Sequence, residues 1–139
     1  MSNIELKAKL LATAKYLSII ETILATVGTV SIIKVIVISY IYMNNHFEKD
    51  IFSLTTKKNL FDKYLALLTA QKEEFLANLE TIFDVILILV DSQVINLQDK
   101  VLFNNTGKKQ ITDKFLDKIL SVSKSYSDSQ VLREVLNYV

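Results

Sequence analysis

The chain contains no cysteine and no proline, and it has only two glycines among 139 residues. Without cysteine it forms neither disulfides nor thiolate nucleophiles, and zinc and iron–sulfur sites with cysteine ligands are excluded. The lack of proline and the scarcity of glycine favour long helices joined by few sharp turns. We therefore expect a mainly helical protein, and the absence of cysteine is compatible with a cytoplasmic location.

An excess of charge of one sign is also missing, because 16 basic residues oppose 15 acidic ones and leave a net charge of +1. The whole molecule therefore has no field that would hold it on nucleic acid or on an anionic membrane. Half of the residues are hydrophobic, which excludes disorder and predicts a large core or a surface that a partner covers. No linker or repeat interrupts the chain, so we expect one domain over residues 1–139.

A long amphipathic helix that runs directly into a short hairpin, at residues 74–105, is the segment around which we expect the chain to be organised. Its apolar residues recur at three- and four-residue intervals, which places them on one side of a helix. These residues are Phe75, Leu76, Leu79, Ile82, Phe83, Ile86, Leu87 and Val90. Residues 94–97 and 101–103 then predict two strands joined by a polar turn. A helix followed by such a wing ends a winged helix, so we predict a mainly α, winged-helix-like helical domain with one small β-hairpin.

The N-terminal part of the chain predicts two further apolar segments. A stripe of leucine, isoleucine and valine predicts a helix over residues 4–27, which Gly28 ends, and Ser31 can cap the next helix. Residues 32–43 are apolar on nearly every side and rich in β-branched residues. The sequence leaves open whether they form a buried helix or a buried strand.

The remaining helices are expected on either side of the central segment. One runs from about residue 56 to residue 72, and another covers residues 112–125. A last helix begins at a capping box, in which Ser127 and Gln130 satisfy the first free backbone donors.

Residues 22–43 raise the question of a transmembrane helix, because they are long and apolar enough to span a bilayer. Lys34 lies near the middle of this segment and costs roughly 2.5 to 3.5 kcal/mol there. Gly28 also places a helix boundary inside the supposed span. We therefore favour two soluble helices, and a small membrane-anchored protein is the second alternative for the function.

Residues that could support catalysis are few and isolated. The only histidine, His46, has Glu48 and Asp50 as neighbours in a polar loop, a grouping that is common by chance. Glu80 and Asp84 share one side of the central helix, where a solvated helix surface explains them without chemistry. No glycine-rich phosphate loop or metal-binding spacing occurs. We predict that the protein is not an enzyme and that it uses no cofactor or metal.

Several lysines lie near the predicted wing, which in a winged helix can touch phosphates while a helix enters the major groove. We select Lys100, Lys108 and Lys109 as candidate nucleic-acid contacts. Base edges are normally read by Arg, Asn or Gln, whereas the helix before the wing presents acidic and apolar residues. Sequence-specific binding is therefore disfavoured, and a winged-helix DNA-binding regulator is the first alternative.

The chain carries more apolar residues than one side of its short helices can bury. These residues are either internal core, or they form a patch that a partner covers. We expect at least one such patch to contact a partner, and we select six residues for it. They are Ile36, Ile38, Tyr40, Tyr42, Val85 and Ile88.

Four segments together resemble a known family. They are residues 17–24 (LSIIETIL), 30–40 (VSIIKVIVISY), 89–97 (LVDSQVINL) and the closing segment 127–139, which ends in NYV. The pattern resembles the small middle components of bacterial ABC-three-component systems, such as the small subunit of Lamassu-type antiphage defence complexes. The resemblance covers about residues 10–139 in pattern and order, and it includes no chemical motif.

This resemblance implies a cytoplasmic, winged-helix-like accessory subunit bound to a large SMC-like coiled-coil ATPase that senses foreign DNA. A third subunit, often a nuclease, would be held inactive until sensing occurs. The small subunit would bridge or stabilise the ATPase and this effector in antiphage or anti-plasmid defence, with weak or indirect DNA contact. No site residue is carried over, because the family offers no residue-level motif that this sequence matches.

Overall fold

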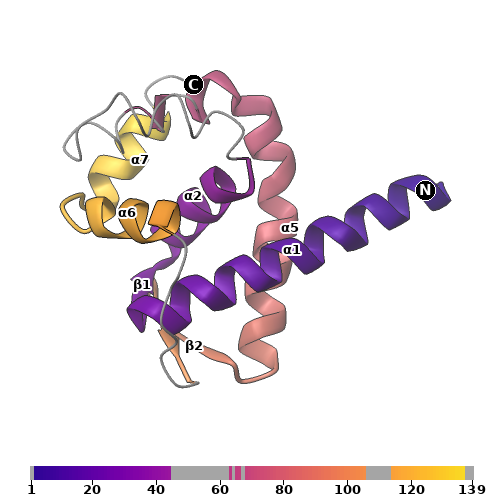
Figure 1. The fold of residues 1–139 in the computed structure, drawn as a ribbon, viewed down its shortest axis with the longest axis horizontal. Coiled ribbons are helices and arrows are strands. Elements are labelled where there is room, and N and C mark those ends of the chain that lie inside the picture. The colour runs from indigo at the N-terminus through magenta and orange to yellow at the C-terminus, as the bar shows by residue number, and fades with distance from the viewer. Residues whose placement is uncertain (1, 45–62, 64, 67, 106–113, 137–139) are drawn as a thin grey trace.

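The computed structural model describes residues 2–44, 63, 65–66, 68–105 and 114–136, and it confirms a mainly helical fold with a small antiparallel sheet (Figure 1). In chain order the elements are α1 (Asn3–Val27), β1 (Thr29–Ser31), α2 (Ile32–Met43), α5 (Lys72–Asp91), β2 (Ile95–Gln98), β3 (Val101–Asn104), α6 (Lys114–Ser123) and α7 (Asp128–Leu136). Residues 63, 65–66 and 68–70 are helical as well.

Helix α1 ends where the sequence predicts. The Gly28 N–H donates to the Leu24 carbonyl at 2.8 Å, and Gly28 has φ 78° and ψ −44°. This positive φ costs glycine little because it has no Cβ, whereas it strains other residues. The chain therefore leaves α1 sharply and enters β1 at the next residue.

The ambiguous segment 32–43 is a helix, α2. Ser31 caps it, since the Lys34 N–H donates to Ser31 Oγ at 3.3 Å. Seven consecutive residues, 35–41, are buried, so neighbours cover the helix on all sides. A helix that is apolar all round is stable in such a position, and this burial outweighs the modest helix propensity of β-branched residues.

The segment 22–43 is not one continuous helix. It contains the end of α1, strand β1 and the whole of α2. Within the described residues, α1 alone is long and apolar enough to cross a membrane, a property that core helices and N-terminal signal sequences share.

The sheet contains a third strand that the sequence analysis does not predict. The strand order is β1-β3-β2, and both pairs are antiparallel, with Val30 opposite Leu102. Two further backbone bonds join this region to the wing: the Ile32 N–H donates to the Lys100 carbonyl at 2.9 Å, and the Asn104 N–H donates to the Gly28 carbonyl at 2.8 Å. The predicted hairpin is confirmed, and β1 extends it on one side.

The central helix, α5, is present, and its predicted stripe is partly buried: Phe75, Ile82 and Ile86 are in the core, and Leu79 and Val90 pack against it. Its buried residues are Phe75, Ile82, Val85, Ile86 and Leu89. The predicted stripe also contained Leu76, Phe83 and Leu87, which are 51%, 47% and 58% exposed. Helix α5 has two adjoining apolar stripes, and periodicity alone does not tell which one packs against α1 and α2.

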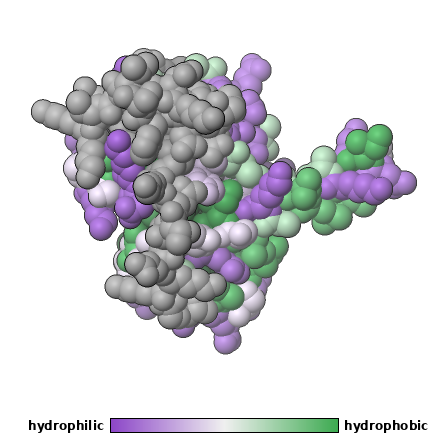
Figure 2. Space-filling model, viewed as in Figure 1, coloured by the Kyte–Doolittle hydropathy of each residue, from purple (hydrophilic) through white to green (hydrophobic). Residues whose placement is uncertain are grey.

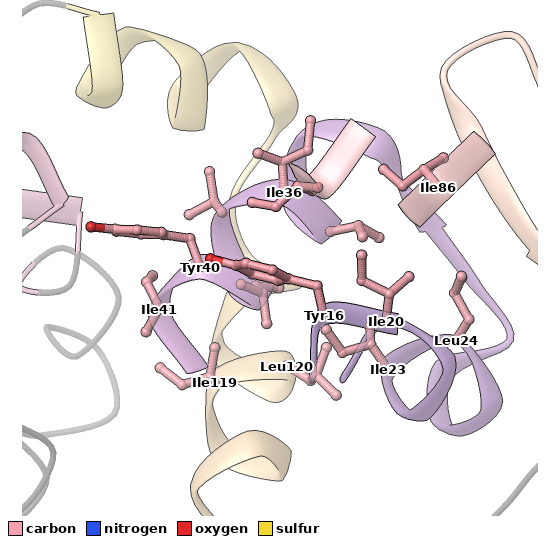
Figure 3. Close-up of a cluster of buried hydrophobic side chains, with 14 of the residues drawn as sticks. Tyr16, Ile20, Ile23, Leu24, Ile36, Tyr40, Ile41, Ile86, Ile119 and Leu120 are labelled. Carbon is pink, nitrogen blue, oxygen red and sulfur yellow. The ribbon is translucent and has the colours of Figure 1, made fainter. Parts of the chain in front are cut away.

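One cluster of buried side chains joins the helices to the sheet. Figure 3 shows Tyr16, Ile20, Ile23 and Leu24 from α1 gathered with residues of α2, α5 and α6. Leu102 of the wing and Val131 of α7 belong to the same cluster and are fully buried. The described residues therefore share a continuous core.

Helix α7 is fixed at its start by the predicted capping box. The Gln130 N–H donates to Ser127 Oγ at 3.1 Å, and the Ser127 N–H donates to Gln130 Oε1 at 2.7 Å. Ser31 Oγ also donates to Asp128 Oδ1 at 2.6 Å, across 97 positions of sequence. A charge-assisted bond of this length is among the stronger hydrogen bonds in proteins, and it ties α7 to the start of α2.

We expect Gly28→Ala to lower the free energy of unfolding by about 1–3 kcal/mol, because alanine strains a backbone at this positive φ. Urea unfolding followed by far-ultraviolet circular dichroism measures the change. Ser121→Ala, on the exposed side of α6, is the control and should stay within about 0.5 kcal/mol of the parent. Equal stability of G28A and the parent would contradict the assigned role of Gly28.

Candidate protein-binding face

The six residues predicted to contact a partner do not form one surface. Four of them are at most 6% exposed and belong to the core: Ile36, Ile38, Tyr40 and Val85. Tyr42 is partly buried against that core, and Ile88 is 45% exposed on α5. The surface role expected for the first four is therefore corrected to a core role. The reason is that α1, α5, α6 and α7 surround α2 and use its apolar surface internally.

The structure instead exposes a row of large apolar side chains on α5. Leu76, Phe83 and Leu87 follow one another at spacings of seven and four residues, so they lie in one line along the helix. Each is about half exposed. Isolated exposed leucines are common on soluble proteins, but a row of large apolar side chains beside a groove is typical of a binding surface.

A groove between α2, α5 and α7 lies directly beside this row. Its cavity volume is about 210 Å³. Val37 of α2, Leu79 of α5 and Val135 of α7 line it, and Leu76 and Phe83 belong to both the groove and the row. We call the row and the groove together the apolar face. Thr69 and Lys72 are the polar residues that line the groove within the part of the chain that the structure describes.

Acidic residues border the row on the side away from the groove. Glu73, Glu80, Asp84 and Asp91 recur at spacings of seven, four and seven residues, which places them in a second line along α5. Three of them are exposed, and Asp84 is half-buried. We call this line the acidic edge. The pairing of Glu80 with Asp84 noted in the sequence is thus part of a longer charged border.

The nucleic-acid candidates are only partly placed. Lys100 is exposed in the β2–β3 turn next to Asp99, which has φ 56°. Lys108 and Lys109 lie outside the described residues, as do His46, Glu48 and Asp50. The described residues contain no group of three or more His, Asp or Glu side chains that could hold a metal ion.

Two buried tyrosines hold α5 in place and so fix the direction of the apolar face. Tyr40 donates to Gln71 Oε1 at 3.2 Å, where α5 begins, and its ring meets the edge of Phe75 with centroids 5.1 Å apart. Tyr16 of α1 donates to Asn78 Oδ1 at 3.1 Å, two turns further along. Burial, and next the charge of Glu74, raises the pKa of Tyr40 to about 12. Burial likewise raises the pKa of Tyr16.

A second apolar surface lies on the N-terminal part of α1. Residues 3–15, which we call the arm, project beyond the body of the protein (Figures 1 and 2). Large apolar side chains on the arm are exposed by 47% to 81%: Ile4, Leu6, Leu10 and Leu11. Leu6 and Leu10 belong to the apolar stripe that predicts this helix, whereas Ile4 and Leu11 lie on the other side of it. In the structure the core begins at Tyr16, so the stripe continues past the last neighbour that covers it.

Comparison of the chain with models of protein families, with curated proteins and with solved structures finds no match. The function therefore has to be argued from the chain's own surface. The most distinctive described surfaces are the apolar face with its acidic edge, and the arm.

We expect stability to fall as the pH rises from 10 to about 12. The folded state keeps Tyr40 neutral up to about pH 12, whereas the unfolded chain ionises it from its ordinary pKa of 10.0. The stabilisation is complete below pH 10 and is lost as the pH passes through the folded pKa. Urea unfolding midpoints at several pH values measure it. Tyr40→Phe should lose less stability than the parent between pH 10 and about 12. If the unfolding midpoints of variant and parent fell equally with pH, the raised pKa of Tyr40 would be contradicted.

Proposed function

We propose that the protein is a non-catalytic accessory subunit that binds a larger protein through its apolar face. The observation that carries this proposal is the outer side of α5, where Leu76, Phe83 and Leu87 stand in one row next to a groove. Covering the exposed half of such a side chain contributes about 1 kcal/mol. A partner that fills the groove as well gains further contacts.

The charges beside the row indicate what such a partner would present. The acidic edge favours a partner with lysines or arginines flanking an apolar stripe. An amphipathic helix lying in a hydrophobic groove is a common mode of peptide recognition. Phe83 stands in the middle of the row and contributes to the groove, so it is the best candidate for the residue that carries most of the binding energy.

The family resemblance suggests the identity of the partner. A large SMC-like ATPase offers long coiled-coil helices, which carry apolar stripes flanked by charges. We therefore propose that the chain attaches to such an ATPase in the cytoplasm and bridges or stabilises the ATPase and an effector subunit in antiphage or anti-plasmid defence. Two observations support this proposal: the family resemblance of the sequence, and the apolar face, whose groove can hold a helix.

The same surface argues against a sequence-reading DNA regulator. In a winged helix the helix before the wing is the one that enters the major groove. Here its outer side carries Glu73, Glu80 and Asp91, which repel phosphates, and no arginine or glutamine lies within α5. Lys100 at the wing has Asp99 beside it and supplies a weak contact at most.

The test is a tagged pull-down of this protein expressed with its neighbouring genes, washed in high salt and analysed by mass spectrometry. A large coiled-coil ATPase should be recovered at a fixed ratio. Phe83→Glu should lower its recovery at least about tenfold, because truncation of a central interface residue costs about 2 kcal/mol or more.

Leu97→Glu is the matched control, since Leu97 is a similarly exposed apolar residue but lies on β2, off the row. It should leave the recovery unchanged. Recovery of the protein alone would overturn the proposal. A salt-sensitive shift of short DNA duplexes, lost on Lys100→Ala, would favour the DNA-binding alternative.

A further inference from the structure

We propose that in the free protein the arm of one copy docks on the apolar face of a second copy. The two surfaces are the large apolar ones that the described residues leave uncovered on helices. They also carry opposite charge, which makes each a suitable partner for the other.

The arm carries an apolar stripe along one side, as a helix that binds in a groove does. Leu6, Leu10 and Leu17 follow at spacings of four and seven residues, so they form one stripe along α1. Farther down the helix the same stripe includes Ile20 and Leu24, which are fully buried in the core. The stripe is thus an apolar seam whose outer part has no neighbour within its own chain's described residues.

The charges of the arm match the acidic edge. Lys7 and Lys9 flank the stripe on its two sides, and Lys15 follows, against the single acid Glu5. Two arms laid against each other would place lysines beside lysines. An arm laid on α5 would instead place one of the two flanking lysines beside Glu80 and its neighbours, because the acidic edge borders the row on one side. Charge complementarity therefore selects the apolar face, and not a second arm, as the docking surface.

The lengths of the two surfaces also agree. The arm, residues 3–15, is about 20 Å long at 1.5 Å per residue. The row from Leu76 to Leu87 extends about 17 Å along α5 by the same rule. One arm is therefore long enough to cover the whole row and exceeds it by about 3 Å.

The arm cannot reach the apolar face of its own chain. Helix α1 crosses α5 where Tyr16 bonds Asn78, and Tyr16 is fully buried. Asn78 lies on the core side of α5, roughly opposite the acidic edge. Figure 1 shows the arm continuing straight past α5 and away from the body. Because α1 is one uninterrupted helix, bringing the arm back would require breaking it, so the occupant is a second copy.

In a reciprocal exchange of arms, each copy supplies one arm and one face to the other. Such a closed pair leaves neither surface open and does not extend into a filament. A consequence that rests on the proposed function is that a partner helix binding the apolar face would displace the arm. The self-associated form would then be the unloaded form of the subunit.

The first measurement is the mass of the full chain by size-exclusion chromatography with light scattering. We expect twice the chain mass of 15.8 kDa at low salt, and a shift towards the single chain at high salt. Lys7→Glu with Lys9→Glu forms the arm variant, and Glu80→Lys with Asp91→Lys forms the face variant. Each should be monomeric by itself.

The decisive experiment is to mix the two variants. The glutamate arm of the first meets the lysine edge of the second, and the remaining arm and face are both unchanged, so a mixed dimer should form. Lys124→Glu is the control, because Lys124 is exposed in the turn after α6 and belongs to neither surface. This variant should remain a dimer. Circular dichroism should show that all variants are folded, because the substitutions are at exposed positions.

Three results would each overturn the inference: a parent chain that is monomeric at high concentration, an arm variant that stays dimeric, or a mixture of variants that stays monomeric. The outcome is separate from that for the proposed function. The arm variant should keep or increase its recovery of the ATPase, whereas Phe83→Glu should lose both the partner and the dimer.

Discussion

The joint at residues 28–31 is the constraint on which the rest of the structure depends. Within four residues the chain ends α1, pairs with the wing and caps α2. The Gly28 carbonyl accepts from Asn104, and the Ser31 hydroxyl donates to Asp128. Three parts of the chain that are far apart in sequence are therefore fixed at one place. The direction in which α1 leaves the body follows from this joint.

Helix α5 serves the core with one side and the surface with the other. Its inner side is held by hydrogen bonds from Tyr16 and Tyr40, and these bonds leave the helix little freedom to rotate. The outer side consequently has to present its apolar row and acidic edge to whatever approaches. Burial of the leucines would be favourable if the helix could rotate. Because α5 is held in place, the exposure of its apolar row is the strongest physical argument for a binding role.

The sequence predicted those features that depend on local signals. The end of α1 at Gly28, the Ser31 cap and the Ser127 to Gln130 capping box rest on residues within one helical turn, and all are present. The hairpin rests on residues 95–104 and is present as well. Strand β1 was missed because three residues are too short for a period, and its partner lies some 70 positions later. Such a pairing is decided by tertiary contact and leaves no local pattern.

The site was harder to predict than the fold, for a related reason. Apolar periodicity marks which residues share a side of a helix, but not whether that side meets the core or a partner. Ile38 and Tyr40 were assigned to the surface because α2 is apolar all round, whereas the structure surrounds it. Leu76 and Phe83 were placed in one apolar stripe with Ile82, and the regular spacing did not show that only part of this stripe would be buried. The acidic edge was visible in the sequence, and read together with the stripe it would have indicated an exposed border.

Helix α1 is a single helix in geometry, yet it has two very different local stabilities. From Tyr16 onward its turns are packed into the core. We therefore expect the amide hydrogens of these turns to exchange only when the whole protein unfolds. The arm has no such packing, so its outer turns open at a lower free energy than the rest of α1. It still continues the same helix from the core, which spares it the cost of a new helix nucleus. The arm is therefore the part of α1 in which docking should slow hydrogen exchange most.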